Sequence, residues 1–168
     1  MCWILVFALC AGCFGGSSPE GHDHHLGVVA VVPRTWSVTW RPCPDCADPR
    51  GIFVASSFAT REGPRGLMCG PLPAGGVVVS LDEVLATPLG GRAPRRGDFA
   101  PRPASFRIGA LRSAAVFEGC NQPRTRLFRF RDAGRLLYAW AVFGPHASRA
   151  IRARAEALLD GLRISPTG

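Results

Sequence analysis

The sequence contains no lysine and only one tyrosine in 168 residues, so all 20 basic residues are arginine. Arginine codons are rich in G and C whereas lysine codons are not, which indicates a bacterial genome of high GC content. This bias accounts for part of the net charge of +8. Basic charge can attract nucleic acid, but here the charge alone does not require such a partner, and we expect none.

Motifs of the common enzyme classes are also missing. The chain has no GxSxG, HExxH or Walker-type phosphate loop. His146 stands at the start of a predicted helix, where we expect it to cap the helix or to be solvated. Asp82 and Glu83 are adjacent in a predicted strand and therefore point to opposite faces, so they cannot act as a carboxylate pair. These features favour a non-catalytic domain, and no cofactor or metal is expected.

The longest apolar run is too short for a membrane-spanning helix, which needs about 20 residues. Residues 3–14, WILVFALCAGCF, are typical of the apolar region of a signal peptide, and a small polar stretch follows them. No arginine or lysine precedes this run, although signal peptides are positive there; a start codon further upstream would account for this. The alternative is a buried N-terminal strand in a cytosolic protein.

The stretch CAGC resembles the lipobox of bacterial lipoproteins, in which a cysteine after small residues receives lipid. Cys13 follows Ala11 and Gly12, but Cys10 stands where the family usually has leucine. The resemblance implies a signal peptide at 1–13 with lipid attachment at Cys13, a flexible linker at 14–26 and a single domain at 27–165. The linker holds three histidines that we read as solvated rather than as a metal site: His22, His24 and His25.

The cysteines support export. If cleavage precedes Cys13 and that residue carries lipid, four cysteines remain. An even number in an oxidising compartment predicts two disulfides with three pairings open. The preferred pairs are Cys69–Cys120, which would bridge distant segments, and Cys43–Cys46 as a local loop. A zinc site formed by the same four thiols is the alternative.

The CxxC motif Cys43–Cys46 raises a second alternative, a thiol–disulfide redox protein. In thioredoxin-like proteins the first cysteine lies at a helix N-terminus, which lowers its pKa. Here prolines flank Cys43, and the following ADPRG predicts a turn without a helix. A structural disulfide is therefore favoured.

Short apolar runs bounded by glycine and proline predict strands at 27–32, 51–58, 75–84, 105–109 and 114–120. Between them, Trp36 and Trp40 with β-branched neighbours favour an extended segment with both indoles in the core. The proline- and arginine-rich stretch 87–103 predicts a long exposed loop, because it can form neither a central strand nor a helix.

The strongest pattern is a hairpin at 124–144 followed by an amphipathic helix. Phe128 and Phe130 alternate with arginines, and DAG predicts a tight turn with glycine at positive φ. The returning strand is apolar on both faces, which predicts a central position with layers on both sides. Apolar side chains recur at helical spacing in 146–164. Together these features predict an α+β domain with an antiparallel sheet and a C-terminal helix packed on one face.

The order of these motifs resembles small exported proteins and lipoproteins of high-GC bacteria, whose shape resembles the PsbP-like α/β sandwich. The resemblance covers residues 28–165 and rests on core and turn motifs, among them MCGPLP, GVVVSLDEV, EGC and FRFRDAGRLLYAWAVFG. It implies Cys69 and Cys120 as a shared disulfide, and it carries no activity across.

We therefore expect a non-catalytic accessory or binding domain that is secreted or tethered to the cell envelope. Its partner would be a protein or small ligand that the sequence does not specify, and a lipid anchor would place it at the membrane. A solvated loop is the favoured reading of a set of arginines in and after the predicted loop, and contact with an anionic surface is the alternative: Arg92, Arg95, Arg96, Arg102 and Arg107.

Overall fold

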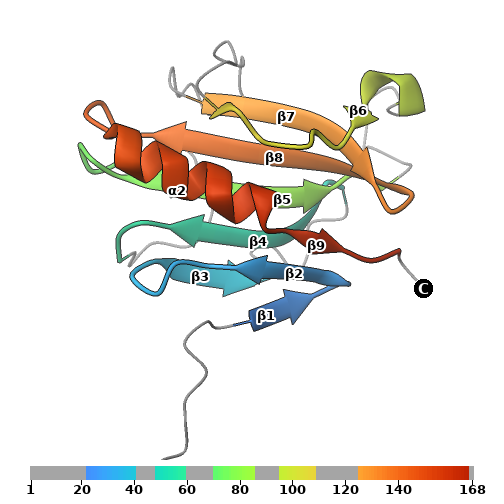
Figure 1. Ribbon diagram of the computed structural model, residues 1–168, viewed down its shortest axis with the longest axis horizontal. Helices are drawn as coiled ribbons and strands as arrows, with labels where there is room; N and C mark the ends of the chain where they lie inside the picture. Colours follow the sequence, from blue (N-terminus) through green and yellow to red (C-terminus); the bar gives the residue numbers. More distant parts are fainter. Residues whose placement is uncertain (1–21, 41–47, 60–69, 86–94, 109–124, 167–168) are drawn as a thin grey trace, which may run out of the picture.

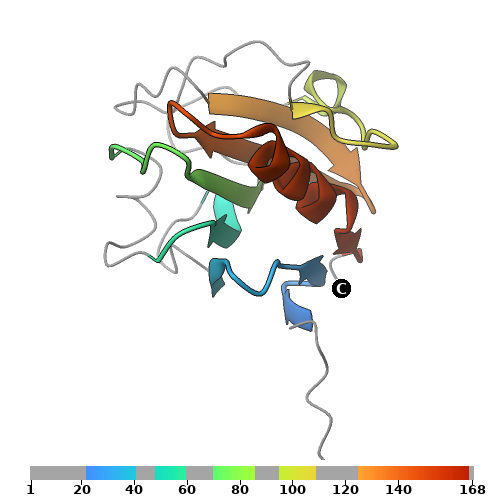
Figure 2. The same ribbon diagram turned by 60° about the vertical axis from the view of Figure 1, so that its left-hand side comes forward.

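The computed structural model describes residues 22–40, 48–59, 70–85, 95–108 and 125–166. Their strands form a six-stranded sheet in the order β3-β4-β5-β8-β7-β6 and a three-stranded sheet in the order β1-β2-β9. Helix α2 (Arg149–Asp160) lies across one face of the larger sheet, and the smaller sheet lies beside it (Figures 1 and 2). The predicted α+β class with a C-terminal helix is confirmed. The larger sheet is antiparallel except for the β6–β7 pair.

The strands are short, from two residues in β6 to nine in β8. The larger sheet is built from β3 (Ser37–Trp40), β4 (Arg50–Ser56), β5 (Val77–Glu83), β6 (Ala100–Pro101), β7 (Thr125–Asp132) and β8 (Arg135–Phe143). The smaller sheet contains β1 (His22–His25), β2 (Val28–Val31) and β9 (Arg163–Ile164). A 3-10 turn, η1 (Arg96–Asp98), precedes β6.

Strand β8 lies inside the larger sheet between β5 and β7, which confirms its predicted central position. Its alternate residues, from Leu137 to Phe143, face α2 and are buried. Trp140 and Val142 on the opposite face are buried as well. A strand apolar on both sides is stable only where both of its faces are removed from water, so this sequence pattern dictated its place.

Two hairpins close through two-residue turns in which both central residues have positive φ. In the β7–β8 turn, Ala133 has φ 50° and Gly134 has φ 81°, which confirms the predicted tight turn. The β1–β2 turn uses Leu26 and Gly27 at φ 51° and 71° in the same way. Such turns match the right-handed twist of the strands. Residues 22–25, within the stretch predicted as a linker at 14–26, form strand β1.

The main core lies between the larger sheet and α2. The helix begins at Ser148, whose side chain accepts a hydrogen bond from the backbone N–H of Ile151 at 3.2 Å. It buries Ala155, Leu158 and Leu159 against strands β5, β8 and β2. His146, two residues before this N-cap, is exposed, so Ser148 and not His146 caps the helix.

The segment after β6 differs from prediction. Residues 105–108 form no strand, although the sequence indicated one. Phe106 is buried against the rings of Phe128 and Phe130, at centroid distances of 5.0 and 5.3 Å. Asp160 and Glu156 on α2 accept hydrogen bonds from the backbone N–H groups of Phe106 and Ile108. The helix therefore satisfies the backbone groups that a neighbouring strand would otherwise have satisfied.

Residues 96–101 also contain more order than the predicted loop. They form η1 and the edge strand β6, which pairs in parallel with β7. Proline is tolerated in an edge strand, since its missing N–H would have faced outward. The predicted strand at 114–120 lies outside the described residues. Among the described residues, no helix is long and apolar enough to cross a membrane.

Candidate functional site

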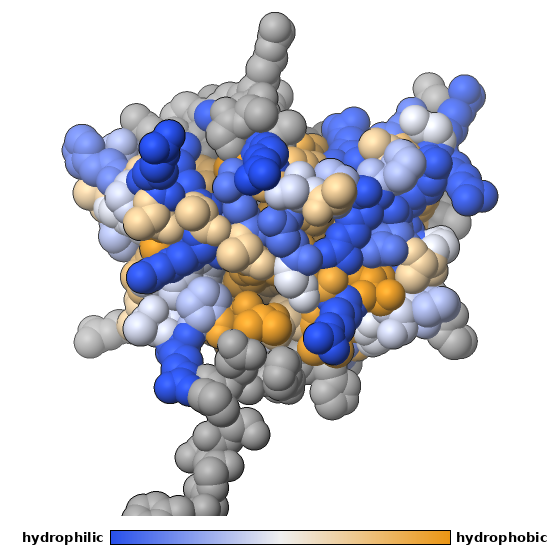
Figure 3. Space-filling model, viewed as in Figure 1, coloured by the Kyte–Doolittle hydropathy of each residue, from blue (hydrophilic) through white to orange (hydrophobic). Residues whose placement is uncertain are grey.

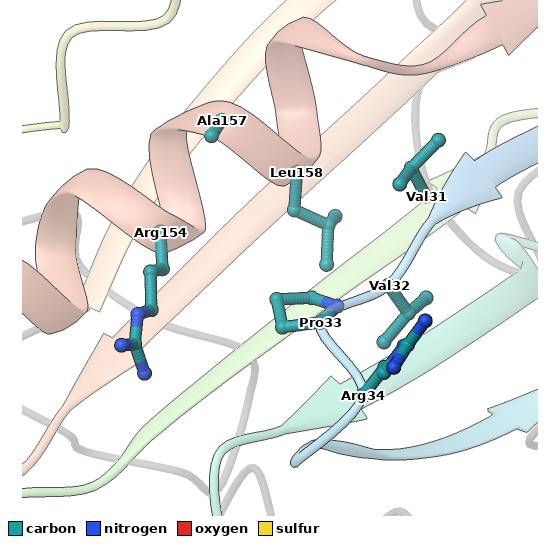
Figure 4. A pocket seen from close by; sticks show the side chains of 7 residues that line it. All are labelled: Val31, Val32, Pro33, Arg34, Arg154, Ala157 and Leu158. Carbon is teal, nitrogen blue, oxygen red and sulfur yellow. The ribbon is translucent and has the colours of Figure 1, made fainter. Parts of the chain in front are cut away.

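A groove lies between helix α2 and the chain that leaves strand β2. Residues 31–34 form one wall, and Arg154, Ala157 and Leu158 form the other (Figure 4). The volume of the groove is about 460 Å³, which lies within the range typical of small-molecule sites. Figure 3 shows hydrophobic surface between α2 and strands β2 and β3, bordered by hydrophilic side chains.

The lining combines an apolar floor with two positive charges. Five of its seven residues are apolar, and none is acidic: Val31, Val32, Pro33, Ala157 and Leu158 are joined by Arg34 and Arg154. Both arginines are exposed and lie on opposite sides of the apolar residues in Figure 4. The groove therefore suits a ligand with an apolar body and an acidic group.

The wall at residues 31–34 is held in place by buried neighbours. The backbone N–H of Trp36 donates to the carbonyl of Pro33 at 2.8 Å, and the Trp36 side chain is 7% exposed within the main core. Leu158 on the opposite wall is 2% exposed. The groove is therefore a preformed feature of the core edge, which limits the cost of ordering it on binding.

The predicted anionic-surface arginines lie in different environments. Arg102 points inward: its guanidinium donates to the carbonyls of Leu162, Leu159 and Asp160 at the end of α2 and to the carboxylate of Asp132. It thereby satisfies helix carbonyls that lack partners of their own. By contrast, the others with a described position are exposed, namely Arg95, Arg96 and Arg107. Arg92 lies outside the described residues.

A buried ion cluster joins the two sheets. Arg135 binds Glu83 through two hydrogen bonds, Nε to Oε1 at 2.7 Å and Nη2 to Oε2 at 2.8 Å. Arg50 donates to the same carboxylate. The remaining nitrogen of Arg135, Nη1, donates to the carbonyls of Leu26 at 2.8 Å and Ser165 at 3.3 Å. Burial raises the pKa of Glu83, but hydrogen bonds to the two guanidinium groups outweigh it, so the net pKa lies below its usual range. This cluster is structural.

Asp82 lies on the opposite face of β5 from Glu83, as the strand alternation predicted. Its neighbours across the strand pair and along β5 are Tyr138 and Ser80. Burial raises the pKa of Asp82 to about 7, and polar contacts with Ser80 and Trp140 lower it only in part. A carboxyl with such a pKa can act as an acid or base at neutral pH. Among the described residues, the side chains that contact Asp82 through polar atoms are those of Ser80 and Trp140.

The residues that the sequence singled out for lipid, disulfide or redox chemistry are not described. Cys13, Cys43, Cys46, Cys69 and Cys120 all lie outside the described residues, so these predictions stay predictions. The three histidines at 22, 24 and 25 belong to strand β1. No group of three or more His, Cys, Asp or Glu suited to a metal occurs in the described part of the chain.

Sequence reasoning missed the groove because its walls are far apart in the chain. Arg34 follows a strand and Arg154 lies in a helix, and neither local pattern indicates that the two share a surface. Comparison with known protein families, characterised proteins and solved structures finds no match for this chain.

Proposed function

We propose that the protein is a non-catalytic, exported binding domain whose groove beside α2 holds a carboxylate with an apolar chain, such as a medium-chain fatty acid. The observation that carries this proposal is the composition of the groove: among the lining residues that the structure describes, an apolar floor lies beside the exposed Arg154 and none is acidic. A carboxylate complements a guanidinium through charge-assisted hydrogen bonds, and its single charge suits a groove that is mostly apolar.

The energetics favour an amphiphilic ligand over a simple anion. Both arginines are exposed, and ion pairs in contact with water contribute only about 0–1 kcal/mol. Each methylene group removed from water contributes about 0.8 kcal/mol, so the apolar chain supplies most of the affinity. The charges then select the acid over the corresponding alcohol and fix its direction in the groove.

Export and tethering through Cys13 form the second part of the proposal. The apolar segment at 3–14, the CAGC stretch and the even number of remaining cysteines support it. A PsbP-like sandwich belongs to the same proposal, supported by a mostly antiparallel sheet with its C-terminal helix on one face. The intact mass of the mature protein from a membrane fraction tests cleavage, lipid and disulfides together.

Titration calorimetry with decanoate, below its micelle concentration, tests the groove. Ala157→Glu places a negative charge in the groove, and we expect it to weaken decanoate binding about tenfold or more. Arg154→Gln should weaken binding of decanoate but not of decanol, because only the acid uses the charge. Arg149→Gln is the matched control, since Arg149 is exposed on the same helix but does not line the groove.

Two results would overturn the proposal. In the first, decanoate fails to bind the folded protein. In the second, Ala157→Glu binds decanoate as tightly as the wild-type protein does, which would place any binding elsewhere.

A further inference from the structure

A second hollow lies at the turn between β7 and β8, and it shares no residue with the groove beside α2. Its volume is about 530 Å³. Three arginines and one carboxylate line it together with small or apolar residues: Arg96, Pro101, Arg102, Arg131, Asp132, Ala133, Gly134 and Leu136. The hollow therefore brings η1, β6 and the β7–β8 hairpin to one place.

The single carboxylate of the hollow is already paired. Arg102 binds Asp132 at 3.0 Å and is itself fixed by carbonyls at the end of α2. Because these two opposite charges offset one another, the remaining charge of the hollow comes from Arg96 and Arg131. The hollow is accordingly electropositive, and its one acidic residue does not compete for those two side chains.

Arg96 and Arg131 have guanidinium N–H donors that make no hydrogen bond to a described residue. Arg131 donates Nη1 to the carbonyl of Phe99 at 2.9 Å, which orients its guanidinium and leaves its other donors without a hydrogen bond to a described residue. Arg96 is exposed on η1, and its side chain makes no hydrogen bond to a described residue. A guanidinium presents five donors in a planar fork that matches the oxygens of a phosphate group.

We propose that this hollow binds a phosphate group carried by a small polar molecule, free or as the headgroup of a lipid. The volume leaves room for a body beside the phosphate. The apolar part of the lining is limited to Pro101, Ala133 and Leu136, with Gly134 completing the turn. Four of the eight lining residues are charged, against two of seven in the groove beside α2, so a compact polar body such as glycerol suits this hollow better than an acyl chain does.

The test measures the chemical shifts of backbone amides as ligand is added to the full domain, with three probes. They are glycerol 3-phosphate, inorganic phosphate, and vesicles containing phosphatidylglycerol compared with phosphatidylcholine vesicles. We expect glycerol 3-phosphate to shift the amides of Ala133 and Gly134, and Arg96→Gln to weaken its binding about fivefold or more. Arg95→Gln is the matched control, because Arg95 precedes Arg96 and does not line the hollow.

The probes separate the two sources of the phosphate. Preference for glycerol 3-phosphate without vesicle binding assigns a free ligand. Binding to phosphatidylglycerol vesicles that is lost in Arg96→Gln and kept in Arg95→Gln assigns a lipid headgroup.

Three results overturn the proposal. One is that no probe binds. Another is that Arg95→Gln and Arg96→Gln weaken binding equally, which indicates a diffuse field and not a site. The third is a set of shifts remote from the β7–β8 turn. Failure of decanoate to bind beside α2 has no bearing on these outcomes, since the two sites share no residue.

Discussion

Replacement of Glu83 by glutamine should cost the domain much of its stability. Glu83 is 4% exposed and Arg135 is 3% exposed, so the substitution leaves a guanidinium charge buried without its partner. Breaking a buried pair in this way costs about 3–5 kcal/mol. Domains of this size are stable by only about 5–15 kcal/mol, so the variant should lose about a fifth or more of its free energy of unfolding.

The matched comparison is Arg50→Gln, which removes the more exposed partner of the same carboxylate. The Arg50 side chain is 30% exposed, against 1% for Arg135, so solvent screens its contribution. We expect a loss of about 0–1 kcal/mol. Urea unfolding followed by tryptophan fluorescence gives both values. A Glu83→Gln loss below about 1 kcal/mol, or one no larger than that of Arg50→Gln, would refute the reasoning.

The same pair sets an acid limit on stability. The pKa of Glu83 in the folded protein lies below its ordinary value of 4.5. As the pH falls below 4.5, Glu83 is therefore protonated in the unfolded chain before it is protonated in the folded protein. The free energy of unfolding decreases as the pH falls through the folded pKa. The contribution is fully present above pH 4.5. Glu83→Gln should be less stable than the wild-type protein above pH 4.5, and the difference should narrow as the pH falls through the folded pKa, because a protonated Glu83 is neutral like glutamine.

Three further outcomes are expected. The pKa of Asp82 is about 7 in the folded protein and 3.8 in the unfolded chain, so the free energy of unfolding should fall as the pH rises between these values. The fall should be at most about 1.4 kcal/mol per pH unit. Asp82→Asn, unfolded in urea, should lack this dependence on pH. Ala133→Asn should raise the midpoint of thermal unfolding by stabilising the turn by about 0.5–1 kcal/mol, whereas Ala133→Val should lower it, since β-branched residues resist positive φ. Gly144→Ala should lower the free energy of unfolding, measured in urea, by about 1–3 kcal/mol, because a Cβ there would lie 2.0 Å from the Pro73 carbonyl oxygen. Gly75→Ala is its control, because a Cβ at residue 75 would have nothing within 4 Å.

Elements with a strong local pattern were predictable. The β7–β8 hairpin follows from alternating phenylalanines and a turn with glycine at positive φ, and α2 follows from apolar residues at helical spacing. Strand β1 was not predictable, because its histidines have no strand preference and it exists through its pairing with β2. The same holds for β6 and β9, whose two residues each are strands only by virtue of a neighbour.

The candidate sites depended even more on tertiary structure. Arg102 was predicted for an anionic surface together with Arg96, yet its guanidinium binds the end of α2. Arg131 was placed only on the polar side of a hairpin, and the structure brings it beside Arg96. No local pattern reports such meetings, because they join segments that are distant along the chain.

By itself, the sequence determined the α+β class, the central strand and the helix that covers one face, since periodicity dictates which side chains leave water. Only the tertiary structure decided which arginines are neutralised within the fold and which border a hollow. The physical reason is that the partner of a charge is set by packing, whereas the burial of an apolar face is set by the order of residues.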